Sequence, residues 1–155
     1  MELCGVRTIG NKKLLKQKKI AVFASRNVRA ETLMNMLDWA NNITRDMCII
    51  GPFHSRLERE VFRLALERGA KVIWLLGRSL PTKFSATEVQ AFKENRLLVI
   101  SCFNRDHHNL ATARYCNHLA ILYAKVVVFG ALEKSQMLTW LQRRCKRLKK
   151  KVVLL

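Results

Sequence analysis

The chain has little acidic character, two prolines and no long apolar run. Its 11 Asp and Glu residues oppose 29 Lys and Arg residues, which leaves a formal net charge of +18 over 155 residues. No apolar stretch approaches the roughly 20 residues that cross a bilayer, and no signal-peptide core follows the basic N-terminus. We therefore expect a cytoplasmic protein without a membrane segment. Half of the residues are hydrophobic, so we also expect an ordered core.

Cysteine and histidine are present without the spacing of a metal site. The five cysteines form no CxxC pair, so no disulfide framework is implied. A zinc site could be drawn from five side chains, but they match no Cys₂His₂ spacing; they are Cys102, His107, His108, Cys116 and His118. We expect no metal and no cofactor.

The motifs of common enzyme classes are missing. No Gly-x-Gly-x-x-Gly follows the first apolar run, and no Gly-x-x-x-x-Gly-Lys-Ser/Thr or Gly-x-Ser-x-Gly occurs. No nucleophile is paired with a base. The sequence thus favours a protein that is not an enzyme.

Short apolar runs recur every 25–29 residues and alternate with helical patterns. The six runs are Ile20–Ala24, Met47–Ile50, Val72–Leu76, Leu97–Ser101, Val126–Phe129 and Val152–Leu155. Such alternation is typical of a parallel sheet covered on both faces. We predict a single Rossmann-like α/β domain over residues 18–155, a three-layer sandwich with a mostly parallel sheet of about six strands. Residues 1–17 are expected to form a basic arm, mobile or partly helical.

Several residues predict where helices begin and end. Ser55 with Glu58, and Ser85 with Glu88, match the capping box that starts a helix. Gly69 is expected to end the first of these helices in the left-handed conformation. A later helix over 109–124 is expected to bury Leu110, Ala113, Cys116 and Ala120. A last helix over Lys134–Leu148 should bury Met137, Leu138, Leu141 and Cys145 and turn its basic side chains outward.

The positive charge is concentrated near the two ends of the sequence. Seven of nine positions from Arg143 to Lys151 are basic, and six basic residues lie between Arg7 and Lys19. This density predicts a polyanionic partner, nucleic acid before an anionic membrane surface. The alternative is a basic surface that serves solubility alone.

The loops that follow the expected strands hold the candidate binding residues, since ligands of such sheets lie beyond the carboxyl ends of the strands. Ser25 and Arg26 follow the first strand, where a helix N-terminus would favour an anion; the alternative is an ordinary polar turn. Gly51, His54 and Ser55 follow the second strand and could contact a phosphate or base. For Ser55 and Glu58 the capping box is a competing explanation.

Later loops add weaker candidates. Arg78 follows the third strand and could pair with a phosphate, although a solvated arginine would explain it nearly as well. Arg114 and Asn117 lie one turn apart on the expected helix after the fourth strand.

Four of these segments together resemble the DNA-processing protein A (DprA, or Smf) family, within the wider group related to the lysine-decarboxylase-like LOG proteins. The resemblance covers roughly Lys19–Leu155. It depends on the segments Ala21–Arg26, Ile49–Gly51, Lys71–Gly77 and Arg114–Ala120. These correspond in order to a strand ending in Gly-Ser-Arg, a strand and glycine before a helix, a further strand, and the helix with Arg-Asn-Arg.

The resemblance implies a non-catalytic protein that holds single-stranded DNA in a basic pocket, in DNA processing and recombination. It carries over Ser25, Arg26, Gly51, Asn117 and Arg114 as binding residues. It also implies a recombinase partner, and a homodimer is a further expectation.

The sequence departs from the family at two motifs. The family's Ser-Gly-x-Ala-x-Gly-Ile-Asp is here Ile50–Leu57, and its Ser-Gly-x-x-x-Thr is here Gly130–Ser135. The LOG motif Pro-Gly-Gly-x-Gly-Thr-x-x-Glu is absent, which argues against phosphoribohydrolase activity. The alternative function is a nucleotide-binding or nucleotide-hydrolysing LOG-related domain with Glu58 or Glu60 as acid and base.

Overall fold

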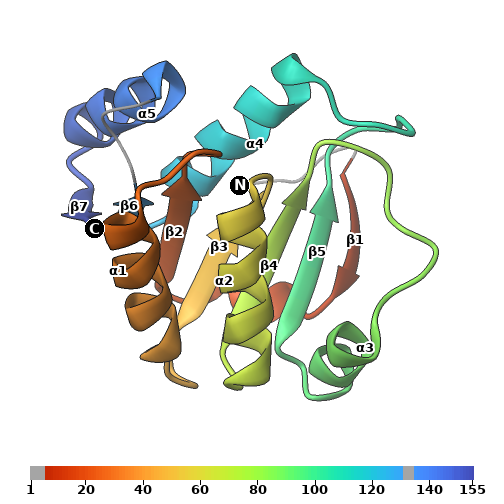
Figure 1. Cartoon of the computed structure of the whole chain (residues 1–155). Helices are drawn as coiled ribbons and strands as arrows, with labels where there is room; N and C mark the ends of the chain where they lie inside the picture. The colour runs from red at the N-terminus through yellow and green to blue at the C-terminus, as the bar shows by residue number, and fades with distance from the viewer. Residues whose placement is uncertain (1–5, 131–134) are drawn as a thin grey trace.

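The computed structural model describes residues 6–130 and 135–155. In these residues seven strands form one sheet in the order β1-β5-β4-β3-β2-β6-β7 (Figure 1). Neighbouring strands from β5 to β7 are parallel, and only β1 pairs antiparallel with its neighbour β5. The predicted Rossmann-like α/β architecture is confirmed.

All six expected strands are present, within one or two residues of their predicted bounds. They are β2 (Lys19–Ala24), β3 (Cys48–Gly51), β4 (Lys71–Leu76), β5 (Leu97–Ser101), β6 (Val126–Gly130) and β7 (Lys151–Leu154). The central strands β2 to β6 are almost wholly buried, because helices cover both faces of a parallel sheet. This double burial explains why they appear in the sequence as continuous apolar runs.

The segment before residue 18 differs from the expected arm. Residues Arg7–Gly10 form β1, an edge strand on β5, and Lys12–Lys16 form a 3₁₀ helix, η1, whose Leu14 is buried in the core. β1 has no apolar run because three of its four residues are exposed. Gly10 is required at the turn, since it has a φ of +108° and a Cβ there would lie 2.1 Å from the Leu97 carbonyl oxygen.

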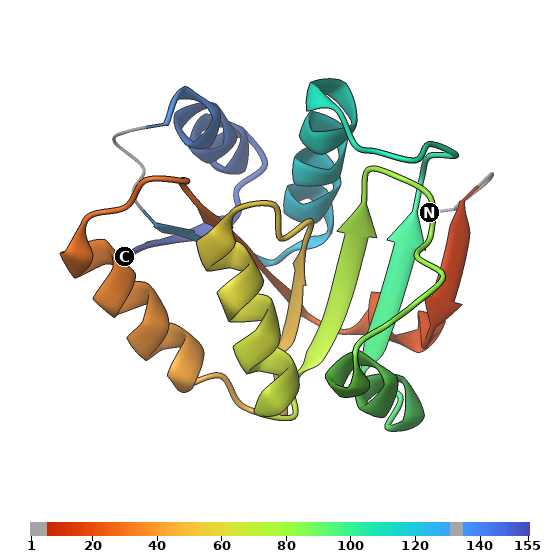
Figure 2. The same cartoon turned by 45° about the vertical axis from the view of Figure 1, so that its right-hand side comes forward.

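In the described part of the chain, five α-helices cover the two faces of the sheet (Figures 1 and 2). One face carries α1 (Ala30–Asn41), α2 (Arg56–Glu67) and α3 (Ala86–Lys93); the other carries α4 (Leu110–Tyr123) and α5 (Gln136–Arg147). Each layer has its own apolar cluster, so the sheet is the middle of three layers. No helix in the described residues is both long and apolar enough to span a membrane.

The helix signals in the sequence are confirmed in most respects. The Ser85–Glu88 capping box is formed, and Gly69 has a φ of +83°. The inner face of α5 is buried through Leu138, Leu141 and Cys145, and Met137 is partly buried against the same core. Lys134, where this helix was expected to start, lies outside the described residues.

The predicted buried stripe of α4 is wrong at its first position. Leu110 is 62% exposed and Ala113 is only partly buried, whereas Cys116 and Ala120 are fully buried. Leu110 is the first residue of the helix, so it extends beyond the sheet edge and has no core to contact.

Candidate functional site

The loops after β2, β3, β4 and β5 meet at one edge of the sheet, because the carboxyl ends of parallel strands point the same way. The strand order places β2 between β3 and β6. Chain connections run from β2 toward β3 on one side, and β6 lies on the other side. This reversal beside the first parallel strand is where ligands of open α/β sheets bind.

The Glu58 side chain connects the end of β2 to the loop after β3. Its buried carboxylate accepts hydrogen bonds from the backbone N–H of Ala24, at 2.9 Å, and of His54, at 3.0 Å. Ser55 Oγ accepts from the backbone N–H of Glu58 at 3.2 Å and caps α2. The predicted capping box is thus only half formed, because the Glu58 side chain reaches past the cap to the end of β2.

Burial raises the pKa of Glu58, while the N–H donors of Ala24 and His54 act in the opposite direction. The carboxyl group is surrounded by protein, and both oxygens are used for holding backbone. It therefore positions the loops that carry Arg26 and His54.

His54 lies in a cluster of basic side chains. Its ring stacks on that of His108, with centroids 5.0 Å apart and an interplanar angle of 18°. Burial first, and then the electrostatic effect of His108, Arg26 and Arg59, together lower the pKa of His54 to about 4. The shared electrostatic effect shows that side chains from three loops and from α2 are close at this edge.

His54 and Arg78 line a common pocket of about 350 Å³, which we call the histidine pocket. Its other polar lining residues are Arg59, His108 and Glu88, and its apolar lining includes Phe53, Phe62 and Trp74. Phe53 has a φ of +52°, an unfavourable conformation for an aromatic residue. His108, Phe62 and Trp74 were not predicted to line this pocket, because no local pattern places them beside the β3 loop.

Gly77 lets the segment before α4 close over the end of β4. A Cβ at this position would lie 2.8 Å from Thr112 Oγ1 and 3.2 Å from His108 Cβ. At Gly51 a Cβ would make only ordinary contacts, 3.6 Å from the nearest atom of Phe53. No neighbouring protein atom therefore requires glycine at 51, and its close approach to a ligand stays a prediction.

Ser25 and Arg26 form a polar turn after β2. The Ser25 N–H donates to the Gly130 carbonyl at 3.3 Å, and its Oγ accepts from the Asn27 N–H at 3.4 Å. The cap of α1 is Arg29, which makes no side-chain capping bond, so neither Ser25 nor Asn27 caps that helix. Arg26 is exposed and faces the same edge as His54.

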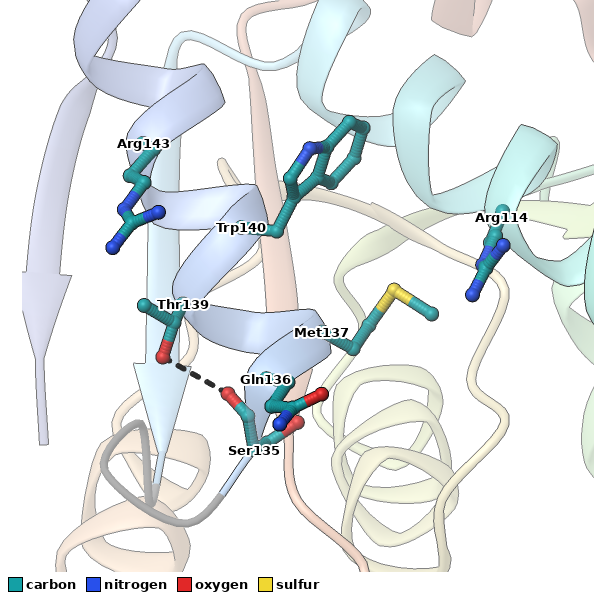
Figure 3. A pocket seen from close by; sticks show the side chains of 7 residues that line it. All are labelled: Arg114, Ser135, Gln136, Met137, Thr139, Trp140 and Arg143. Carbon is teal, nitrogen blue, oxygen red and sulfur yellow. Dashed lines mark hydrogen bonds between the residues drawn. The ribbon is translucent and has the colours of Figure 1, made fainter.

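A second hollow of about 940 Å³ lies between the N-terminal halves of α4 and α5 (Figure 3), and we call it the interhelical crevice. Arg114 lines it from α4; Gln136, Met137, Trp140 and Arg143 line it from α5. Sequence reasoning assigned the basic residues of α5 to an outer face and missed Trp140. It is 49% exposed and lies on the face of α5 that also carries the exposed Gln136 and Arg143, outside the buried stripe of Leu138, Leu141 and Cys145.

Asn117 lies apart from both hollows. It is 8% exposed on the inner side of α4, one turn below Arg114. Of the eight predicted site residues, the structure thus places His54 and Arg78 in the histidine pocket, with Ser25, Arg26, Gly51 and Ser55 on adjoining loops. Arg114 belongs to the interhelical crevice.

Two further possibilities raised by the sequence were a metal site and an acid–base role for Glu60. Within residues 6–130 and 135–155, no three His, Cys, Asp or Glu side chains form a group that could hold a metal ion. Glu60 is on the exposed side of α2 and pairs with Arg63. Its pKa is lowered by the hydrogen bond from Arg63, so it is ionised, and it lines neither the histidine pocket nor the interhelical crevice.

Comparison with solved structures identifies the fold. DNA processing protein A from Streptococcus pneumoniae superimposes with a TM-score of 0.78 at 16% identity, over 96% of this chain. The fold is DprA-like. DNA processing protein A from Helicobacter pylori, whose structure addresses its single-stranded DNA binding mode, gives 0.75 at 17% identity over 96% of this chain. A molybdenum cofactor binding protein from Rippkaea orientalis gives 0.61 at 13% identity over 89% of this chain and 76% of its own.

The DprA-like region is shorter than the proteins it matches. It spans 54% of the pneumococcal chain and 70% of the Helicobacter chain. No family model and no curated protein matches the sequence. The likeness is thus one of fold, carried by structure at low sequence identity.

Protonation of His54 should weaken this DprA-like fold at acidic pH. Its folded-state pKa of about 4 lies below the ordinary value of 6.5, so between these values the unfolded chain binds more protons. The free energy of unfolding should therefore have its highest value above pH 6.5 and should decrease as the pH falls from 6.5 toward 4. After allowing for partial solvent exposure, the loss is about 1–2 kcal/mol at pH 4.5.

Urea unfolding at pH 7.5 and pH 4.5 measures this effect. His54→Gln should lose less stability than the wild type between the two values, whereas His107→Gln, at an exposed position, should lose as much as the wild type. Equal acid losses in the wild type and His54→Gln would contradict the assignment.

Proposed function

We propose that this chain is a cytoplasmic, non-catalytic protein that binds single-stranded DNA along the carboxyl edge of its sheet. The observation that carries the proposal is the convergence of Arg26, His54 and Arg78 from three separate loops. Two carboxylates lie nearby: Glu58 is buried and accepts from backbone N–H groups, and Glu88 lines the histidine pocket while forming the capping box of α3 with Ser85. Basic side chains outnumber them at this edge. A polyanion is the ligand that such a cluster attracts.

The DprA-like fold supports the same ligand class. The Helicobacter protein of this fold binds single-stranded DNA, and the present chain covers 70% of it. The net charge of +18 supplies the long-range attraction that a polyanion needs.

We assign the phosphate contacts to Arg26, Arg78 and Arg114. One guanidinium group can donate two parallel hydrogen bonds to two oxygens of a phosphate, and it keeps its positive charge at any physiological pH. The Ser25 hydroxyl and the backbone at Gly51 are proposed to contact the bound DNA strand beside these arginines. Ser55 caps α2 directly after His54, and the buried Asn117 lies on α4, the helix that carries Arg114.

The alternative of nucleotide hydrolysis is less well supported. Both oxygens of Glu58 accept backbone hydrogen bonds, and Glu60 pairs with Arg63 outside the pockets. Incubation with nucleoside monophosphates tests it directly, since release of free base would favour hydrolysis. The recombinase partner and the homodimer stay predictions.

Salt titration tests the proposed function. Each phosphate contact on a single strand contributes about −0.7 to the slope of log affinity against log salt. Three arginine contacts predict a slope of about −2, or a roughly 20-fold weaker affinity at 200 mM than at 50 mM salt. Fluorescence anisotropy with a labelled dT12 oligonucleotide measures it, and no salt-sensitive binding at micromolar protein would contradict the proposal.

A further inference from the structure

Trp140 is an exception among the apolar residues of α5. Its neighbours Leu138 and Leu141 are 4% and 0% exposed, whereas Trp140 is 49% exposed. Its indole ring projects into the space between α5 and α4, where Met137 also points toward Arg114 (Figure 3). A large aromatic surface is thus held at the crevice wall without being used by the core.

The charged residues that the structure describes at the crevice around Trp140 are basic. Arg143 lies three residues further along α5, and Arg114 faces the crevice from α4 (Figure 3). None of the described residues that line the crevice is acidic, and neither arginine forms an ion pair with another described residue. An exposed ring between two arginines suits a ligand that combines flat rings with negative charge.

The crevice also favours one form of such a ligand. It lies between the first two turns of α4 and those of α5, and the indole ring is half exposed there. The bases of a duplex are stacked inside it, whereas those of a single strand can be splayed onto an aromatic side chain. The crevice volume of about 940 Å³ is large enough to hold one nucleotide of a single strand.

We propose that Trp140 is the platform on which a base of the bound strand stacks, while Arg114 and Arg143 contact the phosphates beside that base. The inference rests on the proposed single-stranded DNA binding and names a residue that would distinguish single strands from duplexes. It extends the binding surface from the histidine pocket to the interhelical crevice.

Two oligonucleotides of equal charge separate stacking from phosphate contact. The first is dT12, and the second is a 12-mer of abasic sites with the same phosphates. Trp140→Ala should bind dT12 about 5- to 150-fold more weakly than the wild type, the range for loss of one stacked base. Its affinity for the abasic strand should equal that of the wild type.

Two variants control the experiment. Trp140→Phe keeps an aromatic ring and should retain most of the affinity for dT12. Met34→Ala removes another exposed apolar side chain, 57% exposed on α1 across the sheet, and should bind both strands like the wild type. Quenching of tryptophan fluorescence by dT12 should be smaller in Trp140→Phe than in the wild type.

The outcomes distinguish this inference from the function on which it rests. If Trp140→Ala and the wild type bind dT12 equally well, the stacking role is wrong and DNA binding stands. If the wild type binds dT12 no better than the abasic strand, stacking is likewise excluded. If the wild type binds neither strand, the proposed function and the stacking role both fail.

Discussion

Glu58→Ala is expected to lower the free energy of unfolding by about 2–4 kcal/mol. The variant leaves the backbone N–H groups of Ala24 and His54 without their acceptors, and each such loss costs about 1–3 kcal/mol. Relief from burying a carboxyl group, whose pKa is raised by that burial, offsets part of the cost. Urea unfolding followed by circular dichroism at pH 7.5 measures the change.

Conservative and exposed variants test the explanation. Glu58→Gln keeps one acceptor oxygen, so it should lose about half as much stability as Glu58→Ala. Glu60→Gln changes an exposed residue on the same helix that pairs with Arg63, and such surface pairs contribute about 0–1 kcal/mol. If the free energy of unfolding of Glu58→Ala lies within about 0.5 kcal/mol of the wild-type value, the two N–H groups find other acceptors and the explanation is wrong.

A double charge reversal at the sheet edge, Arg26→Glu with Arg78→Glu, is expected to weaken single-stranded DNA binding by about 100-fold or more. Each charge-assisted hydrogen bond contributes about 1.5–3 kcal/mol, and the new carboxylates repel phosphate as well. Arg26 is exposed and Arg78 lines the histidine pocket, so neither change removes a core contact. Anisotropy with dT12 at 100 mM salt measures the affinities.

The matched control alters the net charge equally at the basic end of the chain. Lys149→Glu with Lys151→Glu also changes the charge by −4, at exposed positions after α5 and on β7. It should weaken binding far less than the edge pair, through reduced long-range attraction alone. Equal losses would assign binding to overall charge, and a loss confined to the lysine pair would place the interface on the C-terminal basic segment.

The pattern of apolar runs was sufficient to predict the three layers of the fold. It did not predict the edge strand β1 or the contacts between the loops. Strands β2 to β6 were predictable because a buried strand is apolar along its whole length. β7 was found because it is apolar after Lys151, although none of its residues is buried. β1 escaped because an edge strand with exposed residues has no such pattern. Leu110 was assigned to the core because periodicity does not show where a helix extends past the sheet.

The site shows the same division. His54 and Arg78 were candidates because each follows a strand, and the structure brings them into one pocket. Glu58 was expected to complete a local capping box, yet its carboxylate accepts from Ala24, 34 residues away. The role of Trp140 also depends on a neighbour distant in sequence, Arg114 on α4.

The sequence by itself determined the alternation of strands and helices, the excess of positive charge, and the strand ends as the places for binding residues. These properties follow from local periodicity and composition, which need no knowledge of distant neighbours. Only the tertiary structure decided the strand order, the carboxylate that joins two loops and the pairing of α4 with α5 around Trp140. Those contacts connect residues far apart along the chain, and they exist only once the sheet has brought its loops to one edge.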